Sequence, residues 1–171
     1  MRRLLPYALV GLLVAGSFVL TSNQGSGPNA ATRLITRVTD GGEAVVESNG
    51  SNLRINGINL VATANGDAVL IGQIVNRTSS ADKLLSISVG ADKATISGLA
   101  DLAPNAPIFF EGEHANAQAV FVGVPAVAGT FVDISFGFAK AGLVTVRTKI
   151  QEQSGIYANI GTGAKLAEAS K

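Results

Sequence analysis

The chain has 171 residues, of which 47% are hydrophobic and 15% charged, a length that predicts about one domain with a real core. Its 13 basic and 12 acidic residues give a net charge of +1, and without Arg2 and Arg3 the balance is 11 against 12. This balance argues against a nucleic-acid partner, because phosphate binding needs clustered Lys and Arg. There is no Cys, one His and one Met, the initiator, which excludes disulfides and thiolate metal sites. We therefore predict that the protein is not an enzyme and holds no cofactor.

The first twenty residues carry an export signal. Met1-Arg2-Arg3 is followed by the uncharged run from Leu4 to Leu20, and a positive start before an apolar run is typical of a signal peptide or an amino-terminal anchor. As a helix the run would span roughly 25 Å, at the lower edge for crossing a membrane. The two arginines would stay in the cytoplasm, which places the rest outside it. We predict that residues 1–20 are a signal peptide or membrane anchor, that residues 4–20 contact the membrane, and that the body of the protein is extracytoplasmic, in a bacterial cell envelope.

After export this segment is either kept as an anchor or removed by cleavage, and the sequence is compatible with both. Residues 13–17 (LVAGS) resemble a lipoprotein signal box in which Ser17 stands where the lipidated Cys would be, and a serine cannot form the thioether. Ala15 and Ser17 also supply the small residues of an ordinary cleavage site, although cleavage there would leave Phe18 at the new amino terminus. We favour an uncleaved anchor, and a cleaved signal followed by secretion stays open.

The remainder reads as a linker and a strand-rich domain. Residues 21–32 (TSNQGSGPNAAT) have the composition of a flexible linker. Beyond them, short apolar or alternating runs are separated by Gly, Asn, Asp and Pro, which is typical of antiparallel β-structure. We expect strands at 53–60, 68–75, 84–89, 93–97, 108–110, 117–124, 131–138 and 143–150. The prediction is all-β: an antiparallel β-sandwich of about seven to nine strands over residues 33–152, preceded by the hydrophobic helix and followed by a mobile tail over 153–171.

The last two predicted strands divide their side chains between two faces. In each strand one set of alternate residues is apolar and the other is mostly polar or small, and residues 139–142 (AKAG) form the turn between them. In the first strand Val132, Ile134, Phe136 and Phe138 share one face and Phe131, Asp133, Ser135 and Gly137 the other; in the second strand Val144, Val146, Thr148 and Ile150 lie on one side.

Two stretches are similar to a known family. The segment from Gly123 to Phe131, with its Val-Pro-Ala-Val-Ala-Gly turn, continues through a strand ending in Phe138, a Lys-Ala-Gly turn and a Val-rich strand to Ile150. Asn76-Arg77-Thr78 to Leu85 forms a second matching turn. In these features the chain resembles the bacterial copper-chaperone family PCu(A)C and its exported actinobacterial lipoprotein relatives. The resemblance implies an immunoglobulin- or cupredoxin-like sandwich over about 100 residues.

The copper ligands of that family do not carry over. The family holds Cu(I) with His and Met residues, including a His-x-Met pair a few positions before a Gly-Leu step. Aligned on Gly123, those two positions hold Gln118 and Val120, and no methionine follows Met1. Cu(I) prefers thioether, thiolate and imidazole donors, so the resemblance implies the fold without the family's metal site.

One cluster combines an imidazole with carboxylates. Glu111-Gly112-Glu113-His114 is a candidate Zn²⁺ or Cu²⁺ site in which His114 acts with Glu111 or Glu113. The same residues also suit an ordinary polar loop in which Gly112 turns the chain. A catalytic role for His114 would need an oriented nucleophile beside it, and the sequence identifies none.

Other polar motifs read more simply as turns. Asp40–Glu43 (DGGE) and Asn65–Asp67 (NGD) lack the ligand spacing of a calcium loop, and we expect hairpin turns at both. Asn49-Gly50-Ser51 and Asn76-Arg77-Thr78 match the glycosylation sequon, although both also suit turns.

These observations favour an exported, noncatalytic β-sandwich protein, tethered to the membrane or secreted, that acts through contacts with the envelope or with an envelope protein. The alternative is a divergent extracytoplasmic protein that handles copper or another metal through His114. The two differ in whether the folded domain binds a metal ion.

Overall fold

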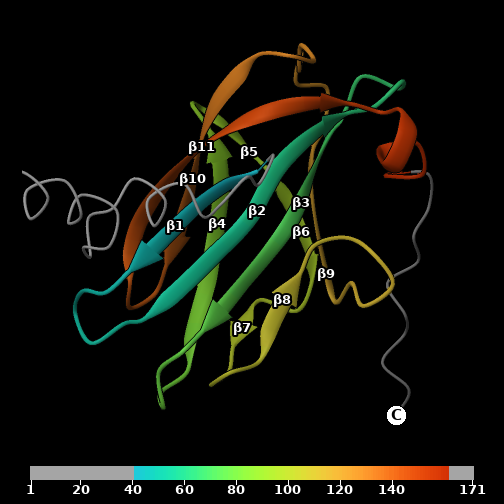
Figure 1. Cartoon of the computed structure of the whole chain (residues 1–171). Helices are drawn as coiled ribbons and strands as arrows, with labels where there is room; N and C mark the ends of the chain where they lie inside the picture. The colour runs from blue at the N-terminus through green and yellow to red at the C-terminus, as the bar shows by residue number, and fades with distance from the viewer. Residues whose placement is uncertain (1–40, 162–171) are drawn as a thin grey trace, which may run out of the picture. The chain divides into compact units, whose positions relative to one another are not determined.

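The computed structural model describes residues 41–161 of the chain (Figure 1). The predicted amino-terminal helix and the linker therefore lie outside the described residues, as does the end of the predicted tail. Between Gly41 and Gly161 the chain is all-β, apart from the short 3-10 helix η1 (Gly155–Tyr157). The strands in this part are β1 (Gly42–Val46), β2 (Leu53–Ala62), β3 (Ala68–Asn76), β4 (Asp82–Val89), β5 (Asp92–Lys93), β6 (Thr95–Gly98), β7 (Asp101–Leu102), β8 (Pro107–Phe109), β9 (Ala117–Phe121), β10 (Phe131–Phe138) and β11 (Gly142–Glu152).

The strands form one mixed, nearly closed sheet. Its order is β5-β4-β10-β11-β2-β3-β9-β6, with β1 added to β2, β7 to β4 and β8 to β3. The long strand β11 connects the two sides of the sheet. It pairs with β10 over residues 142–149 and then with β2 over Ile150–Glu152. In Figure 1 it runs across one end of the domain, beyond the side-by-side strands β2 and β3.

The sequence predicted the long strands well and the short ones poorly. Every strand of eight or more residues lies at a predicted position, because apolar periodicity is clearest in long strands. The predicted strand at 93–97 is instead two strands, β5 and β6, and β1 and β7 were not predicted. The described residues thus contain eleven strands rather than seven to nine: β5 and β7 have only two residues and no alternation to detect, and β1 was missed because its first residues were assigned to a turn.

The prediction that all pairing is antiparallel was also wrong. The end of β11 pairs with β2 in parallel, with Ile150 opposite Leu60 and Glu152 opposite Ala62. This joins the two sides into one path instead of two separate sheets. A parallel pair between strands far apart in sequence leaves no local mark, because no hairpin turn accompanies it.

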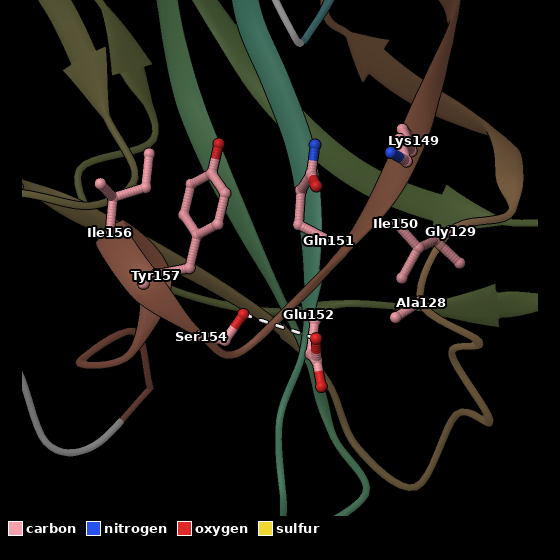
Figure 2. Close-up of a pocket in the computed structure, with 10 residues that line it drawn as sticks. Ala128, Gly129, Lys149, Ile150, Gln151, Glu152, Ser154, Ile156 and Tyr157 are labelled. Atoms are coloured by element: carbon pink, nitrogen blue, oxygen red, sulfur yellow. Dashed lines mark hydrogen bonds between the residues drawn. The ribbon is translucent and has the colours of Figure 1, made fainter.

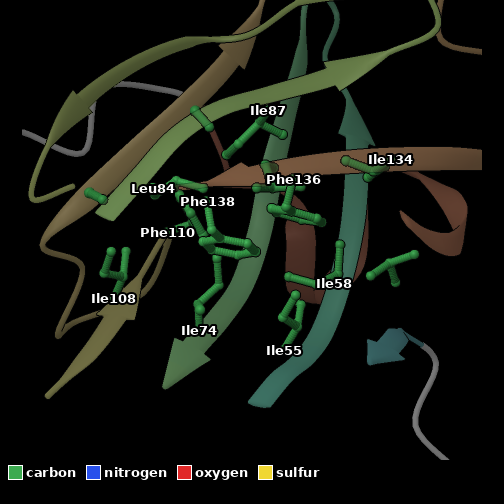
Figure 3. Close-up of a cluster of buried hydrophobic side chains, with 14 of the residues drawn as sticks. Ile55, Ile58, Ile74, Leu84, Ile87, Ile108, Phe110, Ile134, Phe136 and Phe138 are labelled. Carbon is green, nitrogen blue, oxygen red and sulfur yellow. The ribbon is translucent and has the colours of Figure 1, made fainter. Parts of the chain in front are cut away.

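The core lies between the two sides of the sheet and is built mainly from Ile, Leu and Phe, with smaller Val and Ala side chains among them (Figure 3). Phe110, Phe121 and Phe136 are fully buried, and the rings of Phe136 and Phe138 are stacked with centroids 6.4 Å apart. The division of β10 and β11 into two faces is confirmed, and the structure shows which face is inward: Phe136 and Thr148 are buried, whereas Phe131 is exposed. The aromatic residues thus supply much of the buried apolar area.

Two buried polar side chains hold the turn segments. The fully buried Asn76 donates from Nδ2 to the carbonyls of Ser80 and Leu102, at 2.8 and 2.9 Å, and accepts from the Thr78 amide at 3.0 Å. Its amide nitrogen is therefore committed to the fold, which rules out the sequon reading at this position. The other is Asp82, at the start of β4, which accepts backbone hydrogen bonds from the β10–β11 turn.

Candidate functional site

The loop between β8 and β9 carries the three residues predicted as metal ligands. Asn116 closes its base: Oδ1 accepts from the Phe109 amide at 2.8 Å, and Nδ2 donates to the Pro107 carbonyl at 2.9 Å. At the tip, Gly112 has φ +102° and its carbonyl accepts from the Ala115 amide at 3.1 Å. The loop is therefore a turn with a fixed base, and its glycine takes a conformation that other residues adopt rarely.

The structure does not bring the three predicted ligands together around one point. Glu113 and His114 are exposed at the tip, whereas Glu111 is half-buried at its base. Within residues 41–161, no group of three or more His, Asp or Glu side chains is arranged to hold a metal ion. A site built on this loop would need His114 and a carboxylate to be joined by donors from elsewhere.

Glu111 is the unusual member of the loop. Its Oε1 atom is buried and has no hydrogen-bond partner among the described residues. Burial raises the pKa of the carboxyl group above its usual value, and hydrogen bonds from the Gly112 backbone and the Gln118 side chain lower it in part. Burial thus disfavours the charged form of this carboxylate, and a cation beside it would stabilise that form.

Glu111 lines a shallow groove of about 410 Å³ on the β1–β2–β3–β8 side of the domain. The groove combines two carboxylates, two amides and an aromatic ring, and none of its lining residues is basic. They are Glu43, Asn56, Gly57, Gly72, Gln73, Phe109 and Glu111. Such a lining suits a ligand that carries a positive charge and hydrogen-bond donors.

The β2–β3 ladder is irregular beside this groove. The register shifts between Asn56 and Asn59, and Gly72 sits opposite with φ +121°. A Cβ on Gly72 would lie 2.8 Å from the Gly57 carbonyl oxygen and 2.9 Å from that of Asn56, so a side chain cannot be added there without displacing backbone. Bulges of this kind often occur where a sheet forms a binding surface.

The sequence did not predict that Glu43 lines this groove. The segment 40–43 was predicted to be a hairpin turn, but β1 begins at Gly42 and Glu43 lies within that strand. The short apolar run at residues 44–46 (AVV) was the available signal. Asn65–Asp67, by contrast, does form the predicted turn: Gly66 donates to the Thr63 carbonyl at 3.0 Å.

A second groove, of about 550 Å³, lies between the end of β11, η1 and the turn that precedes β10 (Figure 2). Figure 2 shows Lys149 and Gln151 on β11, with Ile156 and Tyr157 on η1. Ser154 Oγ lies 3.5 Å from a carboxylate oxygen of Glu152, a long contact between two exposed groups. No His lines this groove, so the described residues offer Ser154 no base to activate it.

The positions that correspond to the family's His-x-Met pair lie on β9. Gln118 and Val120 are half-buried on its outward side and alternate with the buried residues Ala117, Ala119 and Phe121. Their neighbours across the strand pair are Ser97 and Thr95 on β6. An amide and an alkyl group at these two places offer Cu(I) none of the soft donors it prefers.

Comparison with known proteins identifies the scaffold. No protein-family model and no curated protein matches the chain. Among solved structures, the chain is similar to an apo PCuAC domain from PmoF1, with a TM-score of 0.52 and 24% identity, covering 64% of this chain and 98% of that one. It is also similar to a copper-bound PCuAC domain from PmoF2, with a TM-score of 0.52 and 20% identity, covering 64% and 97%. The described part of the chain thus has a fold that resembles a PCuAC domain, as the sequence predicted.

Proposed function

We propose that this chain is an extracytoplasmic, noncatalytic binding protein that uses a copper-chaperone-like scaffold to contact a protein of the cell envelope. The observation that carries this proposal is the combination of a PCuAC-like fold with Gln118 and Val120 at the positions of a copper-binding pair. A scaffold can keep its fold while its site changes, because function belongs to the site.

The composition of the chain supports binding without Cu(I). The protein has one His, no Cys and no Met beyond Met1, so it lacks a set of soft donors for Cu(I) anywhere in its sequence. What the domain offers instead is surface chemistry. The groove lined by Glu43, Glu111 and Phe109 is the surface that we propose for the contact, since its carboxylates and ring suit a basic side chain of a partner.

The proposal that the protein is exported is based on its amino-terminal segment. Arg2, Arg3 and the uncharged run at residues 4–20 support an anchor or a signal peptide, and the similarity to domains of a family with exported members agrees with this. The part of the chain that the structure describes contains no helix able to cross a membrane. We propose that residues 1–20 deliver the domain across the membrane and that residues 21–32 link it to an anchor.

The contact can be tested by placing a photo-crosslinking residue at Gln73, inside the groove, in the full chain expressed in intact cells. Ser135 on β10 is the matched control, because it is also half-buried and lies on a strand of the other side of the sheet. We expect one discrete product from Gln73 in the membrane or extracellular fraction and none from Ser135. An identical product at both positions, or none at Gln73, contradicts the proposed contact.

A second candidate function is metal handling by His114 with Glu111 or Glu113, joined by donors from elsewhere. The observation that favours it is the buried Glu111 oxygen without a hydrogen-bond partner at the base of the loop. Cu²⁺ and Zn²⁺ are the relevant ions, because imidazole and carboxylate suit both. Titration of each ion into the full chain, with His114→Ala in parallel, separates this function from the first.

A further inference from the structure

Asn-Gly pairs occur three times in this chain, at 49–50, 56–57 and 65–66. An asparagine before glycine can lose ammonia without an enzyme. The backbone nitrogen of the glycine attacks the side-chain carbon of the asparagine, ammonia leaves, and the resulting succinimide takes up one water to give aspartate or isoaspartate. Glycine favours this reaction because it has no Cβ to obstruct the attack and permits the backbone rotation that ring closure needs.

We propose that Asn49 is a site of this modification in the folded protein and that Asn56 and Asn65 are protected from it. Because the three Asn-Gly pairs belong to one chain, their reaction rates can be compared under identical solution conditions. Their surroundings in the fold differ in the two features that decide the rate: whether the asparagine side chain is held, and whether the glycine nitrogen can become a nucleophile.

Asn49 and Gly50 form the tip of the β1–β2 hairpin. Both are exposed, with φ of 52° and 73°, and the Ser51 amide donates to the Ser48 carbonyl at 2.8 Å, as in a two-residue turn. Nothing lies within 4 Å of the place where a Cβ of Gly50 would be. Within the described part of the chain, neither the Asn49 side chain nor the Gly50 amide forms a hydrogen bond. The groups that must approach one another can therefore rotate at little cost.

Asn65 is the matched case, because it is equally exposed and also lies in a turn. Its side chain is held at both ends: Oδ1 accepts from the Thr63 hydroxyl, and Nδ2 donates to Asp67 Oδ2 at 2.9 Å. The Gly66 amide donates to the Thr63 carbonyl at 3.0 Å, which disfavours its deprotonation. Cyclisation at Asn65 must break all of these bonds, so we expect it to be slower than at Asn49 by at least about tenfold.

Asn56 is protected by the sheet instead. It pairs with Gln73 of β3, and its carbonyl oxygen would lie 2.9 Å from a Cβ on Gly72. The backbone of Gly57 is packed against Gly41, where an added Cβ would come within 2.6 Å of the Gly57 carbonyl carbon. Closing a five-membered ring here requires rotation of backbone that Gly41 and Gly72 approach closely, which only opening of the strand pair would permit.

Modification at Asn49 has two consequences for the protein. The new carboxylate lowers the net charge from +1 to 0 and removes the Asn49-Gly50-Ser51 sequon. When the product is isoaspartate, the backbone gains one atom inside a two-residue turn. The register that this turn sets, with Val46 opposite Leu53, is then no longer supported by its hairpin geometry.

The test is a time course of the full chain at mildly alkaline pH, followed by peptide mapping that distinguishes aspartate from isoaspartate. We expect conversion at Asn49 at least about tenfold faster than at Asn65 or Asn56. In urea the three rates should converge, because only the fold separates them. Thr63→Val, which removes one bond to Asn65, should accelerate conversion at Asn65 and leave Asn49 unchanged. Equal rates at Asn49 and Asn65 in the folded protein would overturn the proposal, as would an unchanged Asn65 rate in Thr63→Val.

Discussion

Asp82 fastens the start of β4 to the turn between β10 and β11. Asp82 is buried, with only 7% of its surface exposed. Oδ1 accepts from the amides of Lys83 and Lys140, at 2.7 and 2.8 Å, and Oδ2 accepts from the Ala141 amide at 3.1 Å. Two of these donors lie almost sixty residues away in sequence, so the carboxylate closes a long loop of chain. We predict that the fold depends on it.

The size of the effect follows from the number of bonds. A hydrogen bond to a charged group contributes about 1.5 to 3 kcal/mol, and bonds to one carboxylate add less than their sum. Asp82→Ala leaves three amides without this acceptor, and we expect a loss of about 3 to 4 kcal/mol. Asp82→Asn keeps the shape and one oxygen but turns an NH₂ toward the Ala141 amide, which should cost about 1 to 2 kcal/mol.

Urea denaturation of the purified protein measures this series. With a slope of about 2 kcal/mol per M, Asp82→Ala should lower the midpoint by about 1.5 to 2 M, and Asp82→Asn by about 0.5 to 1 M. Asp133→Asn is the control, because Asp133 is exposed and only 3.8 Å from Arg147, a surface pair that contributes less than about 1 kcal/mol. If Asp82→Ala shifted the midpoint no further than Asp133→Asn, the reasoning would be refuted.

Four further results are expected. Phe136→Ala should cost about 3 to 5 kcal/mol in thermal unfolding, because it empties a fully buried site, and a loss below about 1 kcal/mol would contradict this packing. Gly72→Ala should destabilise more than Gly66→Ala: both have positive φ, but only at Gly72 would Cβ meet backbone, so equal losses would argue against the close approach. Burial raises the pKa of Glu111 above 4.5, so Glu111→Gln should match the wild type in stability below pH 4.5 and exceed it increasingly as pH rises through the folded pKa; a constant difference across pH would refute the shift. His114→Ala should leave calorimetric titration with Cu²⁺ or Zn²⁺ unchanged if the first proposed function holds, and a loss of binding would favour the second.

The polar groove shows where sequence reasoning stops. Glu111 was noticed because it stands near His114 in sequence, and that neighbour led to a metal site as the hypothesis. In the fold Glu111 lines a groove with Glu43, a residue 68 positions away that the sequence had placed in a turn. No local pattern connects the two residues, because the β2–β3 bulge and the β8 end that bring them to one groove are set by strand pairing.

The sequence by itself determined the strand-rich class, the long strands, the faces of β10 and β11 and the absence of soft copper donors. Each of these depends on local alternation or on composition, which packing does not alter. Only the tertiary structure decided the parallel joining of β11 to β2, the splitting of the 93–97 strand, the grooves, and which of three identical Asn-Gly pairs is held by hydrogen bonds. Some of these features depend on contacts between residues far apart in the chain. Others depend on backbone geometry, which differs for the same Asn-Gly dipeptide in a turn and in a strand.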